Sequence, residues 1–178
     1  AEEFTRIGQM MLDAGQNAQA IQAFQQVATT SQERNLLERS LYGLGKAYYE
    51  QRNYPEAIKS LEDLMIRYPK SGLFYDAKFT LGGAYRETGS LSNAVLALSD
   101  VFKYADKNIL INKASVELGF IQEQQGDLIG ALASFSRVAL LGDPNDAEVR
   151  PLVEQSILKS IDLSDQLQRF SDELESCD

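Results

Sequence analysis

The chain has 178 residues, 26 acidic and 17 basic side chains, a formal net charge of −9, no histidine and one cysteine. Such an acidic chain is a poor binder of nucleic acid, because proteins that bind phosphate backbones present a basic surface. Without histidine or a cysteine cluster the usual zinc and iron–sulfur sites are excluded, so we expect no metal and no cofactor.

No run approaches the roughly 18 apolar residues that a membrane-spanning helix needs. The first residues, Ala1 to Phe4, also lack the basic and apolar regions of a signal peptide. We therefore expect no direct insertion into a membrane. A removed signal, or a cut from a larger multidomain protein, would leave the same sequence.

A period of 37 residues runs along the chain, marked by glycines at positions 8, 45, 82 and 119. Twelve residues after each glycine comes an alanine, then a bulky apolar residue four further on, then another apolar residue after three more. The three sets are Ala20, Ala57, Ala94 and Ala131; Phe24, Leu61, Leu98 and Phe135; and Val27, Leu64, Val101 and Val138. A fixed period of this length indicates a repeat architecture.

Each unit is predicted to be a pair of helices. The sets above stand at i, i+4 and i+7, which is one face of a helix, and a second such face precedes them. Turn residues at Gly15, 52–55, Gly89 and Gly126 separate the two helices of each unit. Between units, the spacing of Thr30 and Glu33 predicts a capping box, and 143–144 reads as the start of a further helix.

We therefore predict an all-α fold, a right-handed α-solenoid of four helix pairs closed by a C-terminal capping helix or helices. It forms a single domain over 1–178, with repeats at about 1–32, 33–69, 70–106 and 107–143 and a cap over 144–178. The small residues at the four glycine and four alanine positions predict close approach of helix axes, because glycine inside a helix costs about 1 kcal/mol relative to alanine.

The cap departs from the period, since Ser156 and Leu163 stand where the next two glycines would fall. An apolar stripe is predicted to cover the end of the stack with one face: Val149, Val153, Ile157, Ile161, Leu167, Phe170 and Leu174. Residues 162–178 hold six acidic side chains and one arginine, without the residue order of a calcium loop. A solvated acidic face is the favoured interpretation of this cluster.

The second unit resembles the tetratricopeptide repeat (TPR), whose pattern is a Leu-Gly pair, a tyrosine three residues after the glycine, an alanine and then a proline. It carries Leu44, Gly45, Tyr48, Ala57 and Pro69 in these places. The resemblance covers residues 1 to about 143, although the period exceeds the family's 34 residues. It implies a protein-binding function.

The segment 67–71, followed by Asp76-Ala77, Leu81-Gly82, Tyr85 and Gly89, resembles the repeats of bacterial cell-envelope proteins. These are of the Tol-Pal coordinator and outer-membrane assembly lipoprotein types. The resemblance implies a periplasmic or envelope location and a protein partner. A cytoplasmic location is the alternative.

Candidate binding residues follow from the family resemblance, which implies a concave face lined by the first helix of each pair. The stripe beside each motif glycine carries aromatic and basic side chains that the core does not need. The predicted groove comprises Arg39, Tyr42, Lys46, Tyr49, Phe79, Arg86, Lys113 and Phe120. Exposed rings beside cations suit an extended or helical peptide. Packing between neighbouring units is the competing interpretation of the same stripe.

No catalytic site is predicted. The chain has no histidine to act as a base, no serine or threonine beside an evident activating partner, and its one thiol is Cys177, next to the last residue. The function predicted is thus a non-catalytic interaction scaffold. A structural module that forms a homodimer or larger homo-oligomer through its terminal helices is the alternative.

Overall fold

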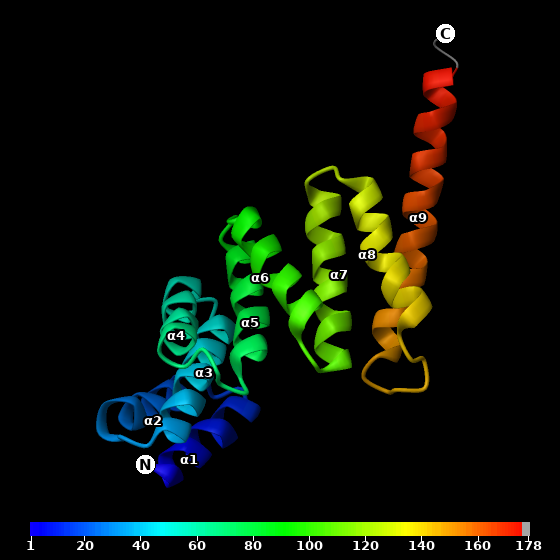
Figure 1. Ribbon diagram of the computed structural model, residues 1–178. Helices are drawn as coiled ribbons and strands as arrows, with labels where there is room; N and C mark the ends of the chain where they lie inside the picture. Colours follow the sequence, from blue (N-terminus) through cyan, green and yellow to red (C-terminus); the bar gives the residue numbers. More distant parts are fainter. Residues whose placement is uncertain (176–178) are drawn as a thin grey trace. The chain divides into compact units, whose positions relative to one another are not determined.

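A computed structural model describes the backbone of residues 1–175 and the side chains up to residue 172, and this part of the chain is all-helical, without a strand. Figure 1 shows the succession of helices. They are α1 (Glu2–Asp13), α2 (Asn17–Thr30), α3 (Arg34–Glu50), α4 (Tyr54–Arg67), α5 (Phe74–Glu87), α6 (Leu91–Tyr104), α7 (Asn108–Gln124), α8 (Leu128–Leu141) and α9 (Arg150–Glu175). The predicted fold class, a solenoid of helix pairs followed by a terminal helix, is confirmed.

The chain forms two compact units, Ala1–Ala97 and Leu98–Asp178, and the division falls within α6. In unit 1, each of α1 to α4 packs against the next helix along the chain, and α3 also contacts α1 and α5. In unit 2, α8 packs between α7 and α9, which also contact each other. Contacts between sequence neighbours are typical of repeat proteins.

The alanine and bulky apolar positions of the 37-residue period form the core. Every one of the twelve residues in the three predicted sets is at most 1% exposed. The glycine positions explain why: a Cβ placed at Gly45 would lie 2.4 Å from Leu61, and one at Gly119 would lie 2.7 Å from Phe135. The predicted close approach of helix axes is therefore confirmed at these two positions.

The turns inside the helix pairs share one backbone conformation. Gly15, Gly89 and Gly126 have φ angles of 70°, 76° and 79°, in the left-handed region that glycine adopts without steric cost. The corresponding residue of the second pair is Arg52, with a φ of 59°. An arginine occupies this position against its conformational preference, because a Cβ disfavours left-handed backbone.

Two predicted helix starts are wrong. The capping box predicted for Thr30 and Glu33 does not form. Glu33 is itself the N-cap residue of α3 and makes no side-chain capping hydrogen bond. Its amide donates to the Ser31 hydroxyl instead of to Thr30. The helix expected to begin at 143–144 begins at Arg150 instead. The carboxylates of Asp143 and Asp146 accept from amides two residues ahead, at Asn145 and Glu148, and hold this segment in turns.

The predicted covering stripe of α9 is half wrong. Val149 and Val153 are buried as expected and Leu167 is half-buried, but Ile157, Ile161 and Phe170 are exposed. Ser156 and Leu163 are fully buried instead. Residues four apart on a helix are offset by about 40° around its axis. Successive steps of four residues therefore carry a side chain progressively away from the face that contacts α8. The face of α9 that meets α8 instead alternates steps of four and three. Leu174 and Cys177 lie outside the described side chains.

Candidate protein-binding surface

The aromatic and basic side chains of α3 lie on one helix face. Tyr42, Lys46 and Tyr49 stand at i, i+4 and i+7, and all three are half-buried. None belongs to the glycine, alanine and bulky apolar positions that hold the helix pairs together. Their apolar surface is therefore shared between packing against neighbouring helices and contact with solvent.

Tyr42 packs toward α5. Burial and the nearby carboxylate of Asp76 raise the pKa of its phenol to about 12, while a hydrogen bond with Thr80 acts in the opposite direction. The ammonium group of Lys46 lies 5.8 Å from the centre of the Tyr42 ring. This distance allows a cation–π interaction, which orients the lysine along the surface of α3.

Tyr49 also reaches α5, where a glycine leaves room for it. A Cβ at Gly83 would lie 3.0 Å from the Tyr49 hydroxyl oxygen. The ring also meets Tyr54 edge-on, with 5.6 Å between ring centres. Tyr54 in turn donates a long hydrogen bond of 3.5 Å to Glu87 at the end of α5. Packing between α3 and α5 thus explains why residue 83 is a glycine. The residue at the same place in the preceding repeat is Lys46.

Two shallow hollows adjoin the basic residues of α3. Exposed Arg39 lines a hollow of about 360 Å³ together with Glu2, Glu3 and Arg6. Lys46 lines another of about 210 Å³ at the turn between α1 and α2. The side-chain oxygen of Asn17, which also lines that hollow, is buried without a hydrogen-bond partner within the described chain. Both hollows belong to unit 1.

On α5, Phe79 and Arg86 are half-buried and occupy the same register as Tyr42 and Tyr49. The Arg86 guanidinium pairs with Glu87 at 2.8 Å. Tyr75 is not among the predicted groove residues. Its half-buried ring lies one turn before Phe79 and meets Phe74 edge-on at 5.3 Å. Its spacing of four residues from Phe79 was the signal that could have identified it.

In unit 2, the two predicted groove residues differ in exposure. Lys113 is exposed on α7, whereas Phe120 is half-buried and meets Phe135 of α8 edge-on at 5.1 Å. The ammonium group of Lys159, on α9, lies 5.5 Å from the centre of the Phe120 ring and 2.8 Å from the carboxylate of Glu123. In unit 2, α9 thus contacts the face of α7 that carries Phe120 and Glu123.

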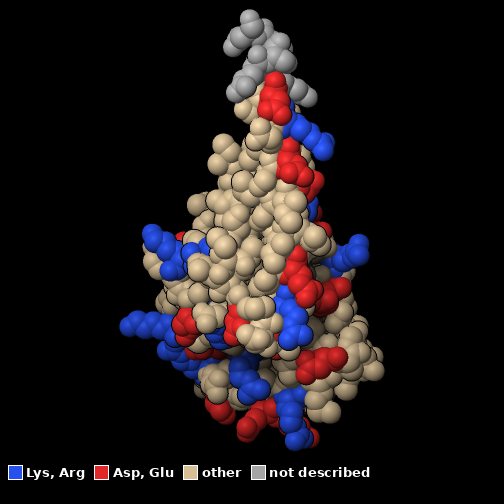
Figure 2. All heavy atoms as spheres, turned by 90° about the vertical axis from the view of Figure 1, so that its right-hand side faces the viewer, with Lys and Arg blue, Asp and Glu red and all other residues tan. Residues whose placement is uncertain are grey.

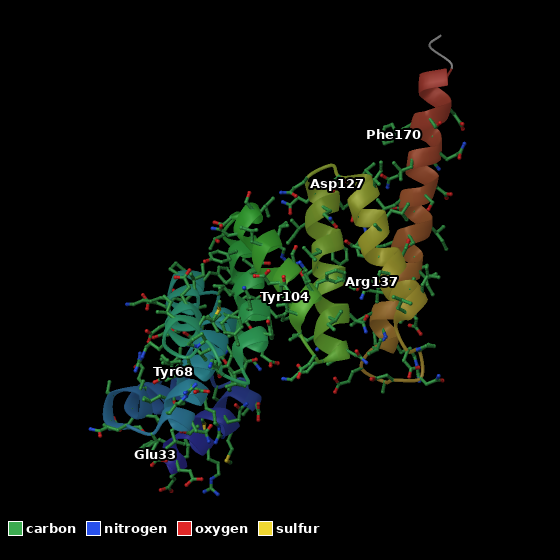
Figure 3. All side chains as sticks on the ribbon, in the orientation of Figure 1. Glu33, Tyr68, Tyr104, Asp127, Arg137 and Phe170 are labelled. Atoms are coloured by element: carbon green, nitrogen blue, oxygen red, sulfur yellow. The ribbon has the colours of Figure 1, made fainter. Side chains whose placement is uncertain are left out.

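The structure brings Arg39, Tyr42, Lys46 and Tyr49 together on α3 and places Phe79 and Arg86 on the adjoining helix α5. We call these six residues the α3–α5 patch. Lys113 and Phe120 belong to unit 2, outside this patch. Figure 3 shows the side chains that project from these helices. The described hollows beside the patch are the two that Arg39 and Lys46 line.

Comparison with known proteins agrees with this architecture. The sequence model of the tetratricopeptide repeat family matches residues 6–71 and 42–108, together more than half of the chain. The chain belongs to the tetratricopeptide repeat family. TPR domains generally serve as non-catalytic scaffolds for protein–protein interaction. No curated protein matches the sequence.

Several solved TPR-like structures are similar to this chain. One is a putative kinesin light chain with nearly identical TPR-like repeats from Podosopora anserina, at 18% identity, covering 98% of this chain and 91% of that one with a TM-score of 0.73. MamA of AMB-1 is 21% identical, with 98% and 91% covered and a TM-score of 0.64. BtubC from P. vanneervenii is 13% identical, with 98% and 80% covered and a TM-score of 0.67. At these identities the likeness establishes the fold alone.

Two further findings concern chemistry. In the part of the chain that the structure describes, no three acidic or cysteine side chains are grouped so as to hold a metal ion. Within the same residues, no helix combines the length and the apolar character needed to cross a bilayer.

Proposed function

We propose that this TPR protein is a non-catalytic scaffold that holds a peptide or a partner segment on the α3–α5 patch. The observation that carries the proposal is the set of half-buried rings Tyr42, Tyr49 and Phe79 on α3 and α5. The Lys46 ammonium lies 5.8 Å from the Tyr42 ring, and Arg86 follows Phe79 on α5. The repeated alanine and bulky positions are buried, and Tyr42 packs against the edge of the cluster that contains Leu61. The rings therefore divide their surface between helix packing and the patch.

The chemistry of the patch suits a segment that combines apolar and acidic residues. Aromatic rings supply a large apolar contact area at low cost in conformational entropy, which is why they dominate binding hot spots. Exposed Arg39 and half-buried Lys46 offer hydrogen bonds and charge to a carboxylate or a backbone carbonyl of the ligand. Acidic side chains lie beside these cations, since Glu2 and Glu3 line the hollow of Arg39, and Asp13 and Glu50 line that of Lys46. A carboxylate of the partner would compete with them for the cations.

The same proposal assigns the scaffold to an assembly of the bacterial cell envelope, in the periplasm. The support is the resemblance of the 67–71 segment and the residues after it to envelope TPR repeats. The test is the full reading frame followed by fractionation of cells that express it. An upstream export signal and recovery in the periplasmic fraction support this location. Recovery with the cytoplasmic proteins would exclude it.

Pull-down with identified partners tests the binding surface. Tyr49→Ala combined with Phe79→Ala removes two rings of the α3–α5 patch and should abolish capture of the specific partner. Tyr104→Ala, which removes an exposed ring at the end of α6, is the matched control and should leave capture unchanged. Helical content and melting temperature must be retained in both variants. Capture of the same partners by a folded double variant would reject the patch.

Self-association through the terminal helices is the second candidate function. A specific observation favours it, because the described part of α9 exposes Ile157, Leu158 and Ile161 together on one side. These three side chains span roughly 100° of the helix circumference, as wide as the buried stripe of an ordinary amphipathic helix.

A further inference from the structure

The first residue of α2 differs in kind from its counterparts in the other repeats. The 37-residue period relates Asn17 to Tyr54, Leu91 and Leu128. Each of these four residues is the first residue of the second helix of its pair. The last three carry an aromatic ring or a branched apolar side chain, whereas the side chain of Asn17 is smaller and polar. The first repeat therefore lacks a bulky side chain at a place where the other repeats have one.

The second repeat shows what fills this place. The Tyr54 ring packs edge-on against Tyr49, and its hydroxyl group donates the long hydrogen bond to Glu87 at the end of α5. The same period relates Tyr49 to Leu12 and Glu87 to Glu50. The first repeat thus keeps the glutamate that accepts this hydrogen bond, but it has neither of the two rings.

A hollow lies at the place of the missing ring. The hollow of about 210 Å³ at the turn between α1 and α2 is lined by Leu12, Asn17 and Glu50, together with Asp13, Gly15 and Lys46. We call it the Asn17 hollow. A cavity of roughly 150 Å³ is large enough to hold benzene, so this volume accommodates one phenol ring. Leu12 is buried and supplies an apolar wall.

Polar groups around the Asn17 hollow lack partners. The side-chain oxygen of Asn17 is buried without a hydrogen bond within the described residues. Among the same residues, no hydrogen bond or ion pair engages the exposed carboxylate of Glu50. Lys46 stands one turn before Glu50 on α3, but its ammonium group lies 5.8 Å from the centre of the Tyr42 ring. The lysine therefore leaves Glu50 available to a donor from outside the chain.

Charge alone does not mark this site. Acidic and basic side chains are interspersed on the face that Figure 2 displays, so carboxylates at a rim are ordinary in this protein. Two of them, Asp13 and Glu50, border the Asn17 hollow. They disfavour an anionic occupant such as a phosphorylated ring, because like charges repel. A neutral phenol suits the hollow, since its ring is apolar and its hydroxyl group donates a hydrogen bond.

We propose that the Asn17 hollow receives a tyrosine side chain of the partner segment. The ring takes the place that Tyr54 occupies in the second repeat, half-buried as Tyr54 is, and its hydroxyl group donates to Glu50. This inference rests on the proposed function, because Lys46 belongs both to the hollow and to the α3–α5 patch. It names one residue type of the segment that the patch holds.

Titration of the whole chain with N-acetyltyrosinamide, a single blocked tyrosine, tests the site. The amide NMR signals of Gly15 and Asn17 report on the hollow, which both residues line. We expect saturable shifts with a dissociation constant on the order of 1 mM, which is the affinity of a small ligand of this size. The phosphorylated form of the probe should not bind, because Asp13 and Glu50 repel it. Absence of a saturable shift up to about 20 mM N-acetyltyrosinamide would overturn the proposal.

Asn17→Tyr supplies the ring from the chain itself. The variant should lose binding of N-acetyltyrosinamide, because the new side chain fills the hollow. It should also raise the urea midpoint, because it buries a ring as the second repeat does with Tyr54. Ala18→Tyr adds the same ring at the neighbouring exposed position, so it is the matched control and should leave both binding and midpoint unchanged. Binding that persists in Asn17→Tyr would reject the hollow as the site.

Removal of the acceptor tests the orientation of the ring. N-acetylphenylalaninamide lacks the hydroxyl group and should bind the original chain about 3- to 10-fold more weakly than the tyrosine probe. Glu50→Ala should bring the two probes to within about 2-fold of each other, because it removes the acceptor. A preference for tyrosine that is unchanged in Glu50→Ala would contradict the hydrogen bond to Glu50.

The pull-down separates this inference from the proposed function. If the double variant of Tyr49 and Phe79 loses the partner while Asn17→Tyr still captures it fully, the patch stands and the tyrosine of the partner is rejected. If N-acetyltyrosinamide binds the hollow but capture does not depend on the patch, the hollow is a tyrosine site and the proposed function alone fails. Loss of capture in both variants supports the two together.

Discussion

Replacing Gly45 by alanine probes the closest approach between the helices of the second pair. The added Cβ would lie 2.4 Å from Cδ2 and 2.5 Å from Cγ of Leu61, where ordinary contacts begin at 3.4 Å. Leu61 is fully buried, so it cannot move about 1 Å aside without displacing its neighbours. Overpacking of this kind costs about 1–3 kcal/mol, while alanine regains about 1 kcal/mol of helix propensity.

We therefore expect Gly45→Ala to lower the free energy of unfolding by about 1 kcal/mol, and Gly45→Leu to disrupt the second helix pair. Urea denaturation followed by circular dichroism at 222 nm measures the first change as a lower midpoint. Gly72→Ala is the control, because no neighbouring atom lies within 4 Å of the Cβ it would add.

A double-mutant cycle with Leu61→Ala isolates the cause. Leu61→Ala alone should cost about 2–5 kcal/mol, because it opens a cavity in the core. Combined with Gly45→Ala, the total loss should be smaller than the sum of the two single losses by about 1 kcal/mol, since the new methyl group enters that cavity. A Gly45→Ala variant as stable as the original chain, or strictly additive losses, would show that the close approach does not limit stability.

Three further changes test other features by the same denaturation assay. Arg52→Gly should stabilise the chain by about 1 kcal/mol, because glycine relieves the left-handed backbone at that residue; an unchanged or lower midpoint would contradict this. Asp127→Ala should cost about 1 kcal/mol, because the carboxylate accepts a 2.9 Å hydrogen bond from the Gly130 amide at the start of α8; Asp127→Ser should recover most of it. Tyr42 holds its proton in the folded chain up to a pKa of about 12, whereas the unfolded chain releases it near pH 10, so the free energy of unfolding should fall by about 2 kcal/mol between these pH values. Tyr42→Phe should remove this contribution; Tyr85, whose pKa burial and Glu62 also raise to about 12, adds a separate fall over the same pH range.

The repeated core could be predicted from the sequence because its signal is local and recurs. The Gly45, Ala57 and Leu61 pattern specifies a helix pair within one unit, and each unit repeats it at the same interval. At Arg52, residue type alone does not predict the backbone conformation. The 37-residue period makes Arg52 the counterpart of Gly15, and its backbone adopts the same left-handed conformation although it is not a glycine.

The remaining features depend on contacts between units, which local spacing does not encode. Whether Tyr42 and Tyr49 are groove or packing residues depends on α5, where Thr80 and Gly83 receive them. The rotation of α9 on α8 was missed for a similar reason, since Val153 and Ile157 are equally apolar and only the surface of α8 selects between them. The sequence therefore predicted the candidate residues, while their partners required the structure.

Among the described residues, the contacts within each unit join only helices that are neighbours or next neighbours along the chain. Chain segments that meet so early in the sequence close short loops, so the entropy lost before the first stabilising contact is small. During synthesis, the α1–α2 hairpin can close as soon as Thr30 has left the ribosome, without waiting for later residues. Nascent chains of this protein therefore expose apolar hairpin surfaces only until the next helix emerges to cover them.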